Sequence, residues 1–291
     1  MKNLDFKPND LVLEIGSGHN PHPRSNILVD RYLTKVDERS GFKIKNDRPL
    51  VIASGEKLPF LDNSFDYIIA NQVIEHVENP RLFCQELSRV GKRGLIICPH
   101  AVREEIFGWQ HHLWWIFSEK NTLNFYSKLT KDKKRSFFHK LYQNKTFFRQ
   151  FCNRQENKLN IYLHWKKKIK IKVHLAPDKT LMKKVRKEAS LLLDKMNYSS
   201  INSFAFYFKE ILIRLALKAR KTGKSISWII KKAFNPNISL DLLIKIIVCP
   251  NCRKKLRLSS KGVFCQSCNI KYPLIDNVPI LLDKEEMKKG Y

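Results

Sequence analysis

The sequence predicts an α/β fold: a doubly wound, mostly parallel Rossmann-like sheet, followed by a basic α-rich region and a small four-cysteine domain. Three observations support this fold class. Short apolar runs alternate with helical or loop segments over about the first 100 residues. The charge then changes abruptly along the chain. Finally, four cysteines form two close pairs near the C-terminus.

The strands of the predicted sheet are apolar runs that end in turn-forming or acidic residues. Because both faces of a parallel sheet are covered, its strands are apolar on both sides rather than alternating. A helical pattern of apolar residues begins after Asn79-Pro80, and a hairpin is expected over 117–125. The predicted strands are 11–15, 26–29, 50–53, 65–70 and 94–98.

The first strand leads into Gly16-Ser17-Gly18, and the second ends in Asp30. Glycines at such a turn allow the backbone to approach a ligand where a Cβ would clash. An acid at the end of the next strand can accept hydrogen bonds from ribose hydroxyls, as in dinucleotide-binding folds. Only about a dozen residues separate Gly18 from Asp30, so the intervening helix is expected to be short or reduced to a turn.

These motifs, together with 56–66 and 73–77, resemble the signature series of class I S-adenosylmethionine-dependent methyltransferases. The motifs lie within about residues 10–100, and the resemblance extends to about residue 125 with the following hairpin, which would supply the last two strands of the family's sheet. The resemblance implies that the protein is an enzyme of the transferase class, a methyltransferase, and that its cofactor is S-adenosylmethionine. The cofactor-binding residues that it implies are Glu14, Gly16, Ser17, Gly18, Asp30, Glu56, Leu58 and Asn71.

Some positions depart from that family. Ser54 stands where many relatives have an acid near the adenine amine, and Asn20-Pro21 replaces a small residue. Asn71-Gln72-Val73-Ile74 lacks the Asn-Pro-Pro-aromatic motif of enzymes that methylate the amino groups of bases and glutamine. A dehydrogenase or a non-catalytic cofactor-binding adaptor is the alternative for this domain.

Methyl transfer to a hydroxyl needs alignment and a base. The candidate catalytic bases are His76, His100 and His112, which follow predicted strands or lie in the His/Trp-rich segment 108–115. Each of these histidines has a purely structural alternative.

The cysteines Cys249, Cys252, Cys265 and Cys268 have the spacing of a four-cysteine zinc ribbon, with a hairpin expected between the pairs. Two such pairs close a tetrahedral site, so Zn²⁺ would be structural. Segment 240–283 resembles the small zinc-ribbon activators of tRNA, rRNA and release-factor methyltransferases. The resemblance implies an activator fused to its enzyme that docks on the catalytic sheet in cis.

The charge of the chain lies mainly in its middle. Residues 128–235 carry 29 Lys/Arg against 6 Asp/Glu, residues 236–291 carry 10 against 5, and residues 1–127 have no net charge. Within 165–172 lysines alternate with apolar residues, and 204–221 and 228–234 have the pattern of basic amphipathic helices. This region could cover the acceptor pocket, contact an anionic membrane surface near a lipid-linked or amphiphilic acceptor, or bind RNA.

We therefore expect three domains: a methyltransferase domain at 1–127, a basic, largely helical region at 128–239, and a zinc ribbon at 240–291. The N-terminus lacks a signal-peptide pattern and no stretch reaches the length of an apolar membrane span. The expected location is cytoplasmic, with peripheral contact to the inner face of the membrane as one option. The acceptor atom, oxygen, nitrogen or carbon, is left open.

Overall fold

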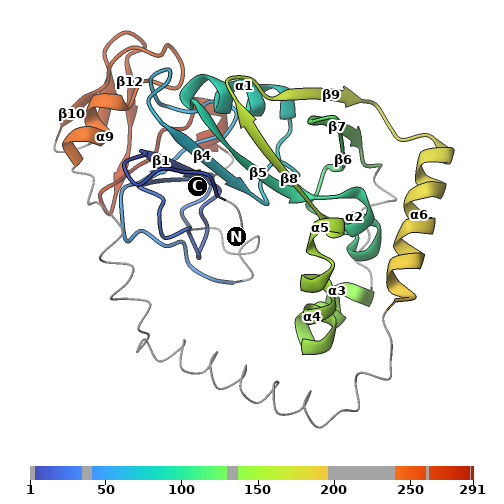
Figure 1. The fold of residues 1–291 in the computed structure, drawn as a ribbon. Coiled ribbons are helices and arrows are strands. Elements are labelled where there is room, and N and C mark those ends of the chain that lie inside the picture. The colour runs from blue at the N-terminus through green and yellow to red at the C-terminus, as the bar shows by residue number, and fades with distance from the viewer. Residues whose placement is uncertain (1–3, 35–40, 130–136, 196–239, 260–261, 289) are drawn as a thin grey trace. The chain divides into compact units, whose positions relative to one another are not determined.

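The computed structural model describes residues 4–34, 41–129, 137–195, 240–259, 262–288 and 290–291 (Figure 1). The chain forms two compact units. Unit 1 comprises Met1–Cys98, Tyr162–Val173 and Asn235–Tyr291, and unit 2 comprises Pro99–Ile161 and His174–Phe234. Each unit is described by itself below.

Unit 1 is built on a six-stranded sheet with the order β3-β2-β1-β4-β5-β8. Five neighbouring strands are parallel, and their direction of succession reverses at β1, between β2 and β4. In open α/β sheets, such a reversal places a ligand crevice at the carboxyl ends of the strands. The strands are β1 (Val12–Ile15), β2 (Ile27–Asp30), β3 (Leu50–Ile52), β4 (Tyr67–Asn71), β5 (Arg93–Pro99) and β8 (Asn160–Lys166).

The α/β prediction is confirmed, and each predicted strand lies within two residues of its expected bounds. Helix α1 (Pro80–Val90) also forms as expected: the Asn79 side chain accepts from the first free amides, and Pro80 occupies the first turn. Its apolar face, including Phe83 and Leu87, is buried. Between β1 and β2 the chain makes only turns, as the short spacing predicts.

The C-terminal part of unit 1 contains the four-cysteine domain, which is a small antiparallel sheet of order β10-β11-β12. The hairpin expected between the cysteine pairs is present, because β10 pairs with β11. The elements are α9 (Leu240–Ile246), β10 (Arg257–Ser259), β11 (Gly262–Cys265), β12 (Ile270–Tyr272), β13 (Leu274–Ile275), β14 (Val278–Pro279) and α10 (Lys284–Lys288).

Residues 278–282, which follow the three-stranded sheet of this domain, pair with the edge of the large sheet. Ile280 forms a parallel bridge with Ile52 of β3, and the Leu281 amide donates to the Ile52 carbonyl at 2.7 Å. Val278, Ile280 and Leu282 pack with Leu28 and other buried apolar residues of β2 and β3. Residues 278–282 therefore extend the edge of the large sheet within unit 1.

Unit 2 has its own apolar core, in which α2 (Ala101–Phe107) packs against α6 (Lys179–Leu193). The hairpin β6 (Trp114–Glu119) and β7 (Thr122–Ser127) forms as predicted. However, the expectation that it supplies the last strands of the large sheet is wrong, because β8 occupies the place beside β5. The remaining helices are α3 (Phe137–Asn144), α4 (Thr146–Arg154) and α5 (Glu156–Leu159).

The alternating basic run at 165–172 is not one strand. Strand β8 ends at Lys166, and the next residue, Lys167, has a φ of 64° that breaks the extended backbone. Strand β9 (Lys170–His174) begins three residues after Lys167 (Figure 1). The two predicted amphipathic helices at 204–221 and 228–234 lie outside the described residues. None of the helices in the described part of the chain has the length and apolar character needed to cross a bilayer.

Candidate cofactor site and metal centre

A cavity of about 280 Å³ lies at the carboxyl ends of the unit 1 strands. Its walls come from the turn after β1, the end of β2, the loop after β3 and the turn after β4. One further wall residue, Glu286, comes from α10. The cavity therefore sits at the reversal point of the sheet, where the topology predicts a ligand.

The glycine turn after β1 forms one wall. Gly16 and Gly18 have φ values of 67° and 54°, which favour glycine. A Cβ on Gly16 would lie 2.1 Å from Cγ2 of Val73, which also lines the cavity. A side chain at position 16 would therefore overlap Val73 in the cavity wall. The Ser17 hydroxyl is buried and makes no hydrogen bond within the described residues, although Ser17 does not line the cavity.

Asp30 ends β2 and lines the cavity, with 8% of its surface exposed. Its Oδ2 accepts from the Gly18 amide at 2.9 Å, and its Oδ1 accepts from the Tyr32 amide at 3.2 Å. Each carboxylate oxygen can accept more than one hydrogen bond. The carboxylate is thus oriented by the backbone and can still accept from a ribose.

Glu14 is buried behind the glycine turn rather than in the cavity wall. It accepts from the His22 amide at 2.7 Å and from Ser25 Oγ at 2.5 Å. Burial raises its pKa from 4.5 to about 7, although these two hydrogen bonds lower it. Burial also lowers the pKa of His22 to about 4. Glu14 therefore holds the loop that follows the glycine turn.

Of the other residues predicted to bind the cofactor, Glu56 lines the cavity, whereas Leu58 and Asn71 do not. Glu56 lines the cavity and accepts from the Asn79 amide at 2.9 Å, and burial raises its pKa. Leu58 is 2% exposed and is not among the described cavity-lining residues; its amide donates to Glu86. Asn71 also lies outside that lining set, whereas its neighbour Gln72 belongs to it.

The three candidate bases have different surroundings. His76 lines the unit 1 cavity. His100 and His112 belong to unit 2. His100 is the N-cap of α2, where its Nδ1 accepts from the Val102 amide at 3.2 Å, and burial lowers its pKa.

His112 is part of a buried charged cluster in unit 2. Its Nδ1 lies 2.6 Å from Oε2 of Glu104, and Lys128 Nζ donates to Oε1 of Glu104 at 2.5 Å. The Lys128 and Glu104 side chains are 0% and 1% exposed. Burial raises the pKa of Glu104, but His112 and Lys128 more than offset burial, so that pKa lies below its ordinary value. Trp109 stacks on His112 with 4.8 Å between ring centroids.

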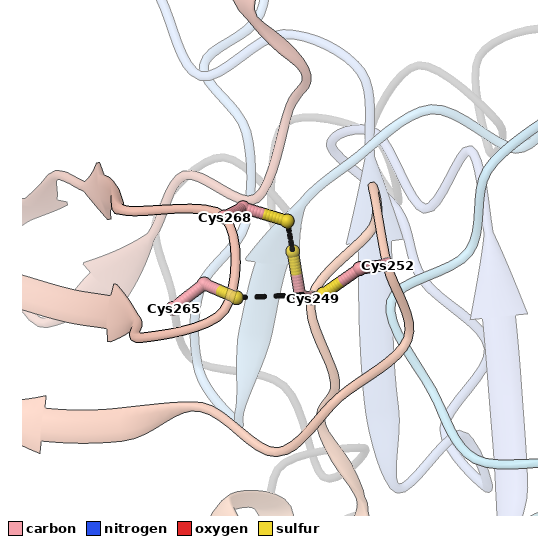
Figure 2. Close-up of side chains that lie close together, drawn as sticks. All are labelled: Cys249, Cys252, Cys265 and Cys268. Carbon is pink, nitrogen blue, oxygen red and sulfur yellow. Dashed lines mark hydrogen bonds between the residues drawn. The ribbon is translucent and has the colours of Figure 1, made fainter.

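The four cysteines of the C-terminal domain converge, as Figure 2 shows, with their sulfur atoms within 4.8 Å of one another. The Cys249–Cys268 and Cys252–Cys265 sulfur distances are 4.0 and 3.5 Å. Zn–S bonds of about 2.3 Å in a tetrahedron put neighbouring sulfurs about 3.8 Å apart. The cluster therefore has the dimensions of a tetrahedral zinc site.

The pKa values of the cysteine thiols also indicate a place for a bound cation. A hydrogen bond from the Lys254 amide lowers the pKa of Cys252 to about 7. Hydrogen bonding to Cys252 in turn raises the pKa of Cys268 to about 12. Further thiolates therefore need a positive charge, which a divalent metal would supply. Tyr272 adds an outer contact, with its hydroxyl 3.2 Å from Cys249 Sγ.

Two features of these sites have little sequence signal. Lys128 and Glu104 are 24 residues apart and belong to no motif that links them. Glu286 is separated from the rest of the cavity wall by some 200 residues. Only the pair Asp283 and Glu286, spaced as in a capping box, indicates a local structure at the C-terminus.

Parts of the chain are similar to known proteins. A family model described as "Methyltransferase domain" matches residues 26–98. An uncharacterized protein of Methanocaldococcus jannaschii is 34% identical over 91 residues, covering 30% of this chain and 42% of that protein. A demethylmenaquinone methyltransferase of Corynebacterium urealyticum is 28% identical over 96 residues, covering 32% and 42%. The chain thus spans about two-fifths of the length of these two relatives.

Solved structures also match. The YcgJ protein of Bacillus subtilis is 24% identical, covers 33% of this chain and 47% of that one, and has a TM-score of 0.26. A chain from the complex of the Haloferax volcanii Trm112 methyltransferase activator is 18% identical, covers 33% and 47%, and has a TM-score of 0.27.

The family match shows that the chain carries a methyltransferase domain, as its resemblance to class I S-adenosylmethionine-dependent methyltransferases implies, and the four clustered cysteines fit a C-terminal zinc ribbon. A 45-residue segment is 38% identical to a UPF0434 protein of Dechloromonas aromatica, covering 15% of this chain and 78% of that protein. This similarity fits the ribbon, and through it the chain belongs to the UPF0434 family.

Proposed function

We propose that this protein is an S-adenosylmethionine-dependent methyltransferase. The observation that carries the proposal is Asp30, fixed by the Gly18 amide in the wall of a cavity where a Cβ on Gly16 would overlap Val73. Asp30 would accept from the ribose hydroxyls, and the turn at Gly16 and Gly18 would face the methionine part. When bound, the cofactor supplies an activated methyl group.

The base is proposed from the surroundings of each histidine. His112 is the best oriented of the three, because Glu104 Oε2 lies 2.6 Å from its Nδ1 and fixes the ring. His76 is the alternative that lines the cavity, and His100 is a third candidate. Each of the three histidines is replaced separately by Gln, and the pH dependence of the methylation rate is measured for each variant. The histidine whose replacement removes the fall in rate at low pH is the base.

The acceptor is proposed to be anionic. No acidic residue occurs between Glu156 and Asp178, and Lys166, Lys170 and Lys172 are exposed on β8 and β9. Such a surface attracts phosphate groups. A lipid-linked or amphiphilic acceptor at an anionic membrane surface is the primary proposal, and RNA is the alternative.

The proposal is tested by incubating the protein with methyl-labelled S-adenosylmethionine and a total cell extract, then separating the organic and nucleic-acid fractions. Asp30→Ala is the control. Label in the organic fraction supports the lipid-linked acceptor, and label in RNA supports the alternative. If the wild type binds the cofactor but labels neither fraction, either the acceptor is a small or soluble molecule absent from the extract or the protein is a non-catalytic adaptor. If it binds neither S-adenosylmethionine nor S-adenosylhomocysteine, the methyltransferase proposal is wrong.

We further propose that the four cysteines hold one structural Zn²⁺. The site offers four sulfur ligands and no open position, which is typical of structural zinc. Metal analysis of the purified protein by mass spectrometry tests this assignment. About one zinc per chain supports it, and a metal-free, folded ribbon would overturn it.

A further inference from the structure

The C-terminal residues 283–291 contribute to a cavity that is otherwise formed by the first 83 residues. Among the described residues that line the cavity, Glu286 is the one that comes from outside 15–83. Its side chain is 18% exposed. We call residues 283–291 the C-terminal latch.

The latch is fixed to the segment that follows Asp30. Arg31 donates to the Glu286 carbonyl at 3.1 Å and to the Gly290 carbonyl at 3.3 Å. The Thr34 hydroxyl donates to the Tyr291 carbonyl at 2.7 Å. One side of the latch is therefore held by the strand end that carries the expected ribose acceptor.

The other side of the latch is fixed to the loop after β3. Lys57 Nζ lies 2.6 Å from Oδ2 of Asp283, and Glu56, the residue before Lys57, lines the cavity. The latch thus joins two loops that each contribute residues to the cavity wall, Asp30 and Arg31 on one side and Glu56 on the other.

The Glu286 carboxylate is held in place by a reciprocal capping box. The Asp283 amide donates to Oε2 of Glu286 at 3.2 Å, and the Glu286 amide donates to Oδ1 of Asp283 at 2.9 Å. Oε1 of Glu286 lies 4.0 Å from Nε of Arg31, beyond hydrogen-bond distance. The carboxylate is therefore positioned by the backbone, and Oε1 retains the capacity to accept.

We propose that the latch is part of the cofactor site and that Glu286 accepts a hydrogen bond from the exocyclic amine of the adenine. This inference rests on the proposed function. An adenine carries an amino donor on its edge, and a carboxylate is an acceptor-only group. The wall contains three other acids: Glu56 accepts from the Asn79 amide, Asp30 lies at the proposed ribose position, and Glu78 is exposed. Ser54 offers only a hydroxyl.

The test compares S-adenosylhomocysteine with S-inosylhomocysteine, whose purine has an oxygen in place of the amine. Calorimetric titration of the wild type is expected to show at least tenfold weaker binding of the inosine analogue, because its oxygen would face the carboxylate. Glu286→Gln keeps the capping box, since glutamine can accept from the Asp283 amide. We expect this variant to bind S-adenosylhomocysteine about tenfold more weakly and to lose most of the discrimination between the two ligands.

Glu285→Gln is the matched control, because Glu285 is exposed on the same helix. It should leave both affinities unchanged. A Glu286→Gln variant with wild-type affinity and discrimination would overturn the inference while leaving the methyltransferase proposal intact. By contrast, a wild type that binds neither ligand would overturn the methyltransferase proposal itself. Glu286→Ala, which also removes the capping box, should behave at least as severely as Glu286→Gln.

Discussion

Replacing Glu14 by glutamine should make the stability of unit 1 less dependent on pH. Burial raises the pKa of Glu14 from 4.5 to about 7, so the folded protein holds this proton more tightly than the unfolded chain does. A group with a raised folded pKa stabilises fully below its unfolded pKa, and its contribution is lost as the pH rises through the folded value. The wild type should therefore lose about 3 kcal/mol from this group between about pH 4.5 and about pH 7.

The amide side chain introduced by Glu14→Gln cannot ionise, so the variant does not incur this loss. His22 titrates in the opposite sense, because its pKa is lowered to about 4, but it is present in both proteins and cancels in the comparison. The free energy of unfolding of the variant minus that of the wild type should therefore rise by about 3 kcal/mol over this interval. Above pH 7 the difference should be constant.

The measurement is guanidinium-induced unfolding at a series of pH values, followed by circular dichroism. Glu119→Gln is the control, since Glu119 is exposed at the end of β6, and its effect should not change with pH. A Glu14→Gln difference that is the same at pH 4.5 and pH 8 would show that Glu14 is ionised without penalty in the folded protein. The buried position would then not explain its role behind the glycine turn.

Three further predictions concern other parts of the structure. Gly16→Ala should abolish measurable cofactor binding in a calorimetric titration, because its Cβ would overlap Val73. Adding Val73→Ala to this variant should restore part of the affinity, and no restoration would contradict the steric explanation. Lys128→Met should lower the free energy of unfolding by about 3–5 kcal/mol, because the buried Glu104 carboxylate loses the Lys128 ammonium group. Denaturant unfolding should show that adding Glu104→Gln to this variant recovers part of the loss. Tyr272→Phe should speed the transfer of zinc to a chelating dye and weaken metal affinity by about tenfold or more, whereas an unchanged affinity would mean that the hydroxyl does not support the thiolate.

Much of the sheet can be predicted from the sequence because its strands are buried on both faces. Each is a continuous apolar run that ends at a glycine, an acid or a turn, as at Gly16 and Asp30. Parallel strands bring their carboxyl ends to one edge, so motifs far apart in the sequence meet there. This explains why the sequence alone is enough to place Gly18 and Asp30 together.

Other features depend on packing that no local pattern specifies. The sequence predicts Leu58 beside the adenine, yet its amide is bonded by Glu86 and its side chain is in the core. The basic run at 165–172 alternates along its length but is broken at Lys167, where the backbone turns. The roles of Glu286 and Lys128 depend on long-range contacts. The three-domain division and the catalytic roles of the histidines stay predictions.

The bridge between Ile52 and Ile280 has a consequence for how the chain is made. Until residue 280 has been synthesised, β3 is an unpaired edge with an apolar surface beside it, and such edges recruit other chains. About 230 residues separate the two positions, which corresponds to roughly 10–50 s of synthesis at ribosomal rates. The nascent protein therefore passes through a period in which this edge is open to pairing with other chains, and the synthesis of residue 280 ends that period.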